Sequence, residues 1–245
     1  MRSFQDFDGF LAWAMERAAA LAMEVEPCPL GELAPDWVVG DSIARPDGGF
    51  FTVEGRRIVR AAGREISGWK QPLIAKETAG FVAFLRTNNH FSPSGRDGFL
   101  VRVKAEPGNY GIQLPGDLDS CVLVAPPVQF SKGNLANHER ALRGENDAQG
   151  RPIKRVPFAS AALPKPPSWV RNVVWEDGVE DGGRFDKKRN RYGRISITDP
   201  AHILDEVALT GAVDDFAWVD LPLLREIRRH GLGNGFLRSA LSMLI

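Results

Sequence analysis

Three ionisable residues stand at alternate positions near the middle of the chain. Arg102, Lys104 and Glu106 are each two residues apart, and Glu106 directly precedes Pro107 and Gly108. Residues two apart on a β-strand point to the same face, so this pattern groups the three side chains where a strand ends and the backbone turns. A carboxylate there can transfer protons, the lysine can lower its pKa, and the arginine suits a phosphate. The competing interpretations are a carboxylate that hydrogen-bonds its own turn and a solvated strand lysine.

Uncharged and aromatic residues form a second set of candidates, suited to binding a ligand. Trp69 and Gln71 are two apart, so on a strand they share a face, where the indole can stack on a planar group and the amide can bind a hydroxyl. A tryptophan packed in the core is the alternative. Asn109, Gln129 and Asn134 occupy turn-like or strand-end positions, in which turn capping is the alternative to ligand binding.

Other common chemical motifs are missing from the sequence. It contains no phosphate-binding glycine loop, no zinc-protease motif and no hydrolase nucleophile elbow. The histidines are scattered without metal-ligand spacing, so we expect no catalytic metal. His138 follows the Asn134 segment and is a second acid–base candidate, because imidazole titrates near neutral pH.

The composition excludes several classes of protein. The 245 residues include 31 Lys and Arg against 31 Asp and Glu, a balance that argues against a nucleic-acid-binding surface. No apolar run approaches the roughly 20 residues that span a bilayer, and charges interrupt the apolar residues at the amino terminus. Cys28 and Cys121 are interpreted as free, reduced thiols. We therefore expect a cytoplasmic protein that does not span a membrane.

The spacing of apolar residues predicts a sheet with helices at both ends of the chain. A helix is expected within residues 1–26, and residues 141–186 read as a long irregular excursion rich in Pro, Gly and charge. Strands are predicted at 50–53 and 56–59, joined by a turn at Glu54 and Gly55, and at 69–74, 80–85, 98–105, 121–130 and 194–197. Helices are predicted at 200–209, 220–230 and 234–244, with Asp220 and Asn234 as N-caps. The pattern indicates an α+β fold in one domain, residues 1–245.

Four segments, in the same order, resemble the NDP-hexose 2,3-dehydratase family. They are Arg45–Gly55, Arg64–Pro72, Phe99–Asn109 and Ala125–Asn134. The third, FLVRVKAEPGN, is the most specific and is similar to the family pattern F-L-x-x-x-K-x-E-P-G-N. Weaker similarity extends over Phe185–Arg191 and the carboxyl-terminal tail, so the resemblance covers nearly the whole chain.

The resemblance implies a Nudix-like mixed sheet flanked by helices, without the Nudix metal-binding box. Members of the family typically carry two tandem copies of this unit, whereas this sequence contains one copy. A homodimer, in which two chains replace the two copies, is therefore expected. Residues Gly111–Ser120 resemble an insertion beside the pocket, which leaves room for a different substrate.

The reaction implied by the resemblance is loss of water across carbons 2 and 3 of a nucleotide-linked 4-keto-6-deoxyhexose, with dTDP as the expected nucleotide. A base removes the proton on carbon 3, an enolate forms, and the hydroxyl on carbon 2 leaves with help from an acid. The product tautomerises to a 2-deoxy-3,4-diketo sugar. No cofactor is required, and the labile product implies a 3-ketoreductase as the next enzyme.

A basic run, Lys187–Arg191 followed by Tyr192, is typical of solvated surface. Because it matches a segment of the family, the resemblance implies a role in binding phosphate. Residues assigned to catalysis are Glu106, Lys104 and His138. Residues assigned to substrate binding are Trp69, Gln71, Arg102, Asn109, Gln129, Asn134, Arg189, Arg191 and Tyr192. The alternatives are a non-catalytic sugar-nucleotide-binding subunit and an enzyme of the same fold that acts on a different carbonyl substrate in a specialised pathway.

Overall fold

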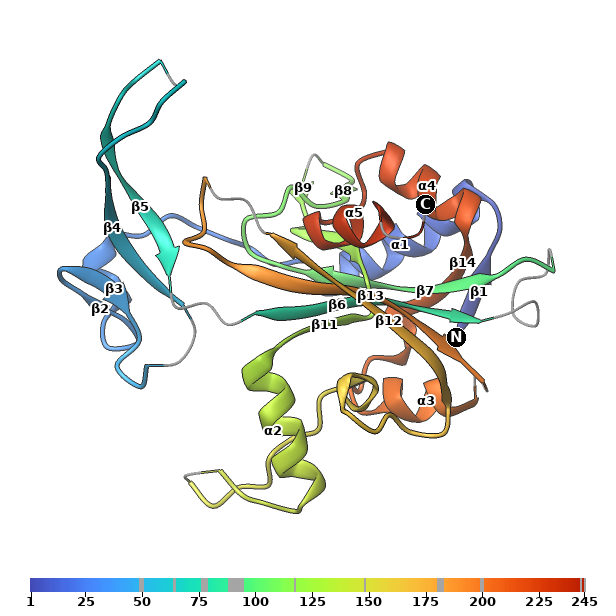
Figure 1. Cartoon of the computed structure of the whole chain (residues 1–245). Coiled ribbons are helices and arrows are strands. Elements are labelled where there is room, and N and C mark those ends of the chain that lie inside the picture. Colours follow the sequence, from blue (N-terminus) through green and yellow to red (C-terminus); the bar gives the residue numbers. More distant parts are fainter. Residues whose placement is uncertain are drawn as a thin grey trace. The chain divides into compact units, whose positions relative to one another are not determined.

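The computed structural model divides the chain into two compact units (Figure 1). It describes residues 1–48, 51–63, 65–75, 79–87, 95–116, 118–147, 149–179, 183–198, 201–242 and 244. The first unit comprises Met1–Val25, Gly80–Glu176 and Arg191–Ile245. The second comprises Glu26–Ala79 and Asp177–Asn190. Each unit is described by itself.

A mixed sheet forms the centre of the first unit. Its strands run in the order β1 (Arg2–Phe4), β14 (Phe216–Asp220), β7 (Gly98–Ala105), β6 (Gly80–Thr87), β13 (Arg189–Ile197) and β12 (Val170–Val179). Pairs β1–β14 and β6–β13 are parallel, whereas β14–β7 and β6–β7 are antiparallel. A mixed sheet flanked by helices confirms the predicted α+β class.

The sheet splits between its two central strands. β6 and β7 pair at Arg86↔Phe99 and Thr87↔Gly98. Further along, β7 pairs with β10 (Val122–Ala125) and β6 pairs with β11 (Val128–Ser131). The single strand predicted over 121–130 is therefore wrong, because Pro126 and Pro127 interrupt it: proline has no backbone N–H for a strand ladder.

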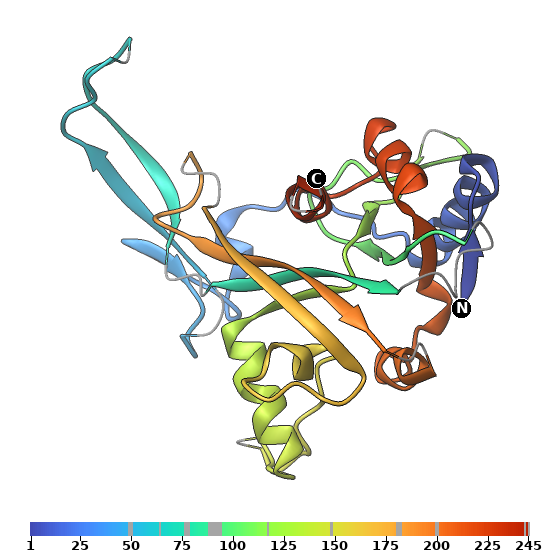
Figure 2. The same cartoon turned by 45° about the vertical axis from the view of Figure 1, so that its right-hand side comes forward.

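Helices cover both faces of this sheet, as the two views show (Figures 1 and 2). On one face, α1 (Phe7–Leu21), α4 (Leu221–Arg229) and α5 (Gly235–Ser242) share an apolar core with Val101 and Val103 of β7. On the other face lie α2 (Lys132–Leu142), α3 (Ala201–Ala208) and the short 3₁₀ helix η2 (Ala159–Ala162), over a core that includes Leu100. The predicted alternation along β7 is thus confirmed.

The predicted helices occur with small shifts at their ends. The amino-terminal helix starts after Asp6, whose side chain accepts a hydrogen bond from the backbone N–H of Gly9, because Arg2–Phe4 forms strand β1 instead. Asp220 caps α4 as predicted. A 3₁₀ turn, η3 (Val213–Asp215), links α3 to β14.

Two stretches contain regular structure that the sequence did not predict: residues 141–186, expected to be irregular, and the insertion-like Gly111–Ser120. Within 141–186 the chain forms η2 and then β12, a ten-residue strand at the edge of the sheet. The residue pattern shows no strand signal for β12 because its residues are largely exposed and partly charged, and an edge strand does not need the apolar alternation of a buried strand. Within Gly111–Ser120, β8 (Gln113–Leu114) and β9 (Leu118–Asp119) form a small antiparallel pair.

The second unit is an antiparallel sheet in the order β2 (Val38–Val39), β3 (Ser42–Ala44), β4 (Thr52–Ile58) and β5 (Trp69–Ala75), preceded by the 3₁₀ turn η1 (Leu30–Leu33). The hairpin predicted to turn at Glu54 and Gly55 is wrong: β4 runs through both residues and pairs with β5 from Thr52↔Ala75 to Ile58↔Trp69. The predicted strand start at Phe50 lies outside the described residues.

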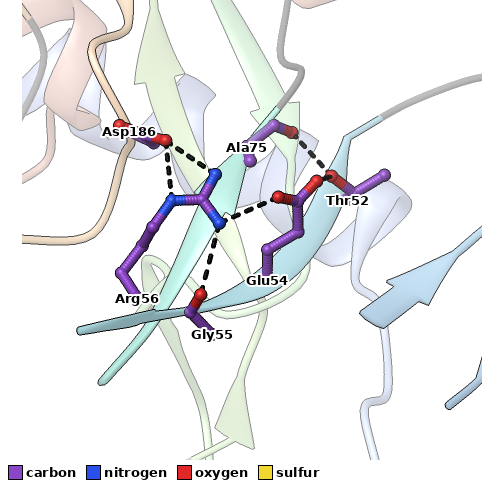
Figure 3. A network of polar contacts seen from close by, with 6 residues as sticks. All are labelled: Thr52, Glu54, Gly55, Arg56, Ala75 and Asp186. Atoms are coloured by element: carbon purple, nitrogen blue, oxygen red, sulfur yellow. Dashed lines mark hydrogen bonds and ion pairs between the residues drawn. The ribbon is translucent and has the colours of Figure 1, made fainter. Parts of the chain in front are cut away.

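A polar network explains why β4 stays extended there (Figure 3). Arg56 donates to Asp186 from Nε and Nη2, at 3.0 and 2.8 Å, and from Nη1 to Glu54 at 2.8 Å. Glu54 also accepts a hydrogen bond from Thr52 at 2.9 Å. Thr52, Glu54 and Arg56 lie on one face of β4, where they hydrogen-bond to one another and, through Arg56, to Asp186. A turn at Glu54 would separate these side chains and break the network.

Candidate active site

A tight turn at the end of β7 sets the direction of Glu106. The backbone N–H of Asn109 donates to the carbonyl oxygen of Glu106 at 3.2 Å, and Gly108 has a φ of 86°. Proline at the second position and a positive-φ glycine at the third are the signature of a type II turn. The sequence Glu-Pro-Gly-Asn therefore brings the first and last side chains of the turn back toward each other.

Four side chains converge on the Glu106 carboxylate. Oε1 accepts hydrogen bonds from Nζ of Lys104 at 2.6 Å and Nε2 of Gln129 at 2.8 Å. Oε2 accepts longer ones from Nδ2 of Asn234 at 3.2 Å and Nδ2 of Asn109 at 3.4 Å. The side chain of Glu106 is 24% exposed and that of Lys104 is 32% exposed, so the group is partly buried yet accessible to a ligand. We call these five residues the carboxylate cluster.

The split in the sheet brings the cluster together. Lys104 lies near the end of β7, whereas Gln129 belongs to β11 on the other side of the split. The segment before α5 joins β10: Val124 donates its N–H to the carbonyl of Leu232 at 2.8 Å, and the N–H of Asn234 donates to the carbonyl of Val124 at 2.9 Å. Residues more than 100 positions apart thus surround one carboxylate.

The surroundings of Glu106 favour its ionised form. Burial alone raises the pKa of Glu106, but the charge and hydrogen bond of Lys104 and the amide donors of Gln129 and Asn234 together lower it below its ordinary value. The group is therefore a carboxylate at neutral pH. It is prepared to accept a proton rather than to donate one.

Arg102 lies on the same strand face but is held differently. Its guanidinium sits over the ring of Phe216, 5.3 Å from the centroid. Burial lowers the pKa of Arg102, and the charges of Asp215 and Glu106 act in the opposite direction. Its Nε is buried without a hydrogen-bond partner among the described residues. Arg102 is thus a cation within the electrostatic reach of Glu106, not one of its hydrogen-bond partners.

His138 is not brought to the cluster. It is buried in α2, and its Nδ1 accepts a hydrogen bond from the backbone N–H of Val156 at 3.1 Å. Burial and the nearby charge of Arg155 lower its pKa, so the ring is neutral at pH 7. Within the described part of the chain, no hydrogen bond or ion pair links His138 to Glu106. The observed contacts give the imidazole a role in anchoring the segment after α2.

Asn134 and the residues of β13 also lie apart from the cluster contacts. Asn134 is exposed in the first turn of α2, where Ser131 accepts from its N–H and donates to its side-chain oxygen. Tyr192 is buried in the core shared with α1, and exposed Arg191 packs beside the rings of Phe81 and Trp175. The second half of the basic run, Arg189, Arg191 and Tyr192, therefore lies on strand β13, with Arg189 exposed at its start.

Trp69 and Gln71 belong to the second unit and face the same side of β5, as predicted. Nε1 of Trp69 donates to Oε1 of Gln71 at 2.6 Å, and Nε2 of Gln71 donates to the carbonyl of Gly183 at 3.1 Å. Arg56 pairs across the sheet with Gln71, so both side chains join the face that holds the segment around Asp186. Both polar groups of Gln71 are thus occupied in the structure.

A surface hollow of about 460 Å³ lies elsewhere, between α2 and the segment that follows it, and does not include the cluster. Its arginines, Arg140 and Arg151, form ion pairs with Glu145 and Asp147, at 2.8 Å each. Their charges are therefore already compensated. In the described residues no group of three or more potential ligands could hold a metal ion, and no described helix is long and apolar enough to cross a membrane.

Asn234 is the cluster member that sequence reasoning did not assign to the site. It was predicted only as an N-cap, which it is: its Oδ1 accepts from the N–H of Leu237 at 2.8 Å. Its side chain is also in contact with Glu106, 128 positions away. No local pattern signals a contact of that separation, whereas Lys104 and Asn109 are neighbours of Glu106 in sequence.

Known proteins resemble this chain over most of its length. Residues 8–244 match the family model described as NDP-hexose 2,3-dehydratase. The chain is similar to proteins named dTDP-4-dehydro-6-deoxy-alpha-D-glucopyranose 2,3-dehydratase: 27% identical over 222 residues in Amycolatopsis orientalis, covering 88% of this chain and 40% of the relative, and 28% over 193 residues in Streptomyces violaceoruber, covering 78% and 34%. A third, from Saccharopolyspora spinosa, is 25% identical over 239 residues. The chain spans about two fifths or less of the length of these relatives. Because the family match extends over nearly the whole sequence, the chain belongs to the NDP-hexose 2,3-dehydratase family.

Proposed function

We propose that this chain is a hydro-lyase that removes water across carbons 2 and 3 of a nucleotide-linked 4-keto-6-deoxyhexose, with dTDP as the nucleotide. The observation that carries the proposal is the Glu106 carboxylate, kept ionised and directly beside an ammonium group in a partly exposed site. The names of the relatives supply the sugar and the nucleotide. The product is a 2-deoxy-3,4-diketo sugar nucleotide.

In the proposed mechanism, Glu106 is the base. The 4-ketone makes the carbon-3 proton acidic, Glu106 takes that proton, and the electron pair forms the enolate. Lys104, 2.6 Å from the carboxylate, stabilises the negative charge on the enolate oxygen. The enolate then expels the carbon-2 hydroxyl, which leaves as water with the proton that Glu106 acquired. The resulting enol tautomerises to the 3,4-diketone, and Glu106 is again a carboxylate.

The hydrogen bonds of Glu106 imply that substrate entry changes the cluster. All four acceptor directions of the carboxylate are in use, and a carboxylate with that many donors is a weak base. The contact with Asn109 is the longest, at 3.4 Å, and comes from a partly exposed turn. A substrate that displaces Asn109 opens Oε2 and removes water, and both changes raise the basicity of Glu106.

The site is proposed to work without His138, whose contacts lie with Val156. Trp69, Gln71, Arg102, Arg189 and Arg191 each remain proposed substrate-binding residues. Two copies of the chain are proposed to associate, since the relatives are more than twice as long. Light scattering at working concentration tests this association, and the mass of a single chain would contradict it. A 3-ketoreductase is proposed as the enzyme that consumes the labile diketone.

The test is a turnover assay with dTDP-4-keto-6-deoxyglucose in excess chelator. The product is trapped by borohydride reduction and analysed by mass spectrometry. A protein-dependent product that has lost one water supports the lyase. Saturable dTDP binding with no change in mass would contradict it and favour a binding subunit, whereas turnover of another keto sugar would favour a same-fold enzyme with a different substrate.

A further inference from the structure

We propose that Asn234 is a positioning residue for the reaction, and that it holds the Glu106 carboxylate in the orientation needed for proton transfer because the capping of α5 fixes its amide. The inference about rate rests on the proposed function. The inference about the carboxylate itself does not, because it concerns a contact that can be measured without substrate.

The helix cap leaves the Asn234 amide one favourable orientation. Oδ1 accepts from the N–H of Leu237, the third residue of α5, at 2.8 Å. Nδ2 therefore points the other way, 3.2 Å from Oε2 of Glu106 and 3.5 Å from Oε1 of Gln129. A flipped amide would set two donors against each other at Leu237 and two acceptors at Glu106. Because Asn234 is only 3% exposed, water could not compensate either loss.

The backbone around Asn234 is held as firmly as its side chain. Its N–H donates to Val124 of β10, and the N–H of Val124 donates to Leu232. A Cβ atom added at Gly233 would meet the side chain of Leu237 at 2.7 Å, so the chain passes closely over α5. Asn234 is therefore anchored to the sheet on one side and to the helix on the other.

The two amides on Oε2 consequently have different tasks. Asn109 makes a 3.4 Å contact from a partly exposed turn, whereas Asn234 is buried and its other polar atom is committed to the helix. When a substrate reaches Oε2, Asn109 is the partner that can leave. Asn234 stays and keeps the carboxylate plane directed at the proton to be removed.

The proposal also predicts how ionisation responds to Asn234. The charged groups acting on Glu106 are Lys104 and Arg102, both on β7, while β11 and the α5 cap contribute the neutral amides of Gln129 and Asn234. Loss of the Asn234 donor therefore removes one stabilising contact of the anion and leaves the cations in place. A second carboxylate at that position would oppose ionisation directly.

Two variants separate this role from helix capping. Asn234→Ser and Asn234→Asp both keep an N-cap acceptor, but serine withdraws the amide donor and aspartate places a carboxylate oxygen against Oε2. In the first we expect kcat to fall about 10-fold with little change in KM. In the second we expect a larger fall in kcat and a rise in the pKa of Glu106, because a second negative charge beside the carboxylate opposes its ionisation. Asp6→Ser, an exchange of caps on α1, is the matched control and should leave both quantities unchanged.

Glu106 is titrated directly by NMR of carboxyl-¹³C glutamate, with its signal assigned by its loss in Glu106→Gln. Melting temperatures verify that each variant is folded. If Asn234→Ser does not fold, the test is made with Asn234→Asp. Unchanged titration of Glu106 and wild-type kcat in a folded variant overturn the proposal. A shifted titration in a protein without turnover would keep the Asn234 contact and remove the proposed function instead.

Discussion

The amide of Gln129 donates to Oε1 of Glu106 at 2.8 Å, although Gln129 lies on β11 and Glu106 follows β7. β6 and β7 pair only at Arg86↔Phe99 and Thr87↔Gly98; beyond that junction β10 pairs with β7 and β11 pairs with β6, and Pro126 and Pro127 separate β10 from β11. This split lets a side chain from each side reach one carboxylate. The resulting network makes several predictions about rate, pH dependence and stability.

Replacement of the proposed base should abolish turnover but not binding. In Glu106→Gln the side chain keeps its size and its place between Gln129 and Asn234, but it cannot take up the carbon-3 proton. We expect kcat to fall at least about 10²-fold with dTDP affinity within a few-fold of wild type. Steady-state kinetics and calorimetric dTDP binding measure the two effects. Glu145→Gln, in an exposed ion pair with Arg140 and Arg143, is the control. Wild-type turnover in Glu106→Gln would remove Glu106 from the mechanism.

Removal of the Lys104 charge should shift the pH dependence of the rate. The ammonium lowers the pKa of Glu106, so Lys104→Met should raise that pKa. A base must be ionised to act; as its pKa rises, activity is lost first at the acidic end. We therefore expect the acid limb of the kcat/KM profile to move to higher pH, in addition to a lower maximum from the lost enolate stabilisation.

Lys104→Arg keeps the positive charge and serves as the matched variant. Its acid limb should stay close to that of wild type even if its maximal rate falls. Should both variants show the wild-type limb, the ionisation that controls the rate does not belong to Glu106.

A buried ion pair should matter more to stability than an exposed one of similar geometry. Arg17 donates to Asp215 at 2.8 and 3.0 Å, and the Asp215 side chain is 3% exposed. Asp215→Ala leaves Arg17 without its partner and removes a compensating charge near Arg102, so we expect a loss of about 3 kcal/mol in unfolding free energy. Glu16→Gln breaks the exposed pair with Arg2 and should cost less than about 1 kcal/mol. Urea unfolding compares the two; equal losses would contradict the argument.

Sequence and structure agree where the determining interactions are local. The alternation along β7 was sufficient to place Lys104 and Glu106 together, because their contact spans two residues. Asn109 was predicted at a turn, and its contact with Glu106, three residues away, was added by the structure. Gln129 was selected by type and position, but its contact depends on the split in the sheet, which the prediction of one continuous strand obscured. Asn234 was recognised only through its local role as a cap. His138 follows Asn134 closely in sequence, which suggested a shared site. No local pattern indicates that its ring instead accepts a hydrogen bond from the backbone N–H of Val156.

The neutral, buried imidazole of His138 should make stability depend on pH. Burial lowers the pKa of His138 in the folded state, so the unfolded chain binds more protons at acidic pH. Its contribution is fully present above the unfolded pKa of about 6.5, and is lost as the pH falls from there through the folded pKa, by at most about 1.4 kcal/mol per pH unit. In His138→Asn the side-chain oxygen can still accept from Val156, but the titratable group is gone. Urea unfolding of both proteins at pH 7.5 and 5.5 should therefore show a smaller decrease for the variant, and the difference between the two cancels the titration of other groups. Identical decreases would show that His138 is not the group that loses stability in acid.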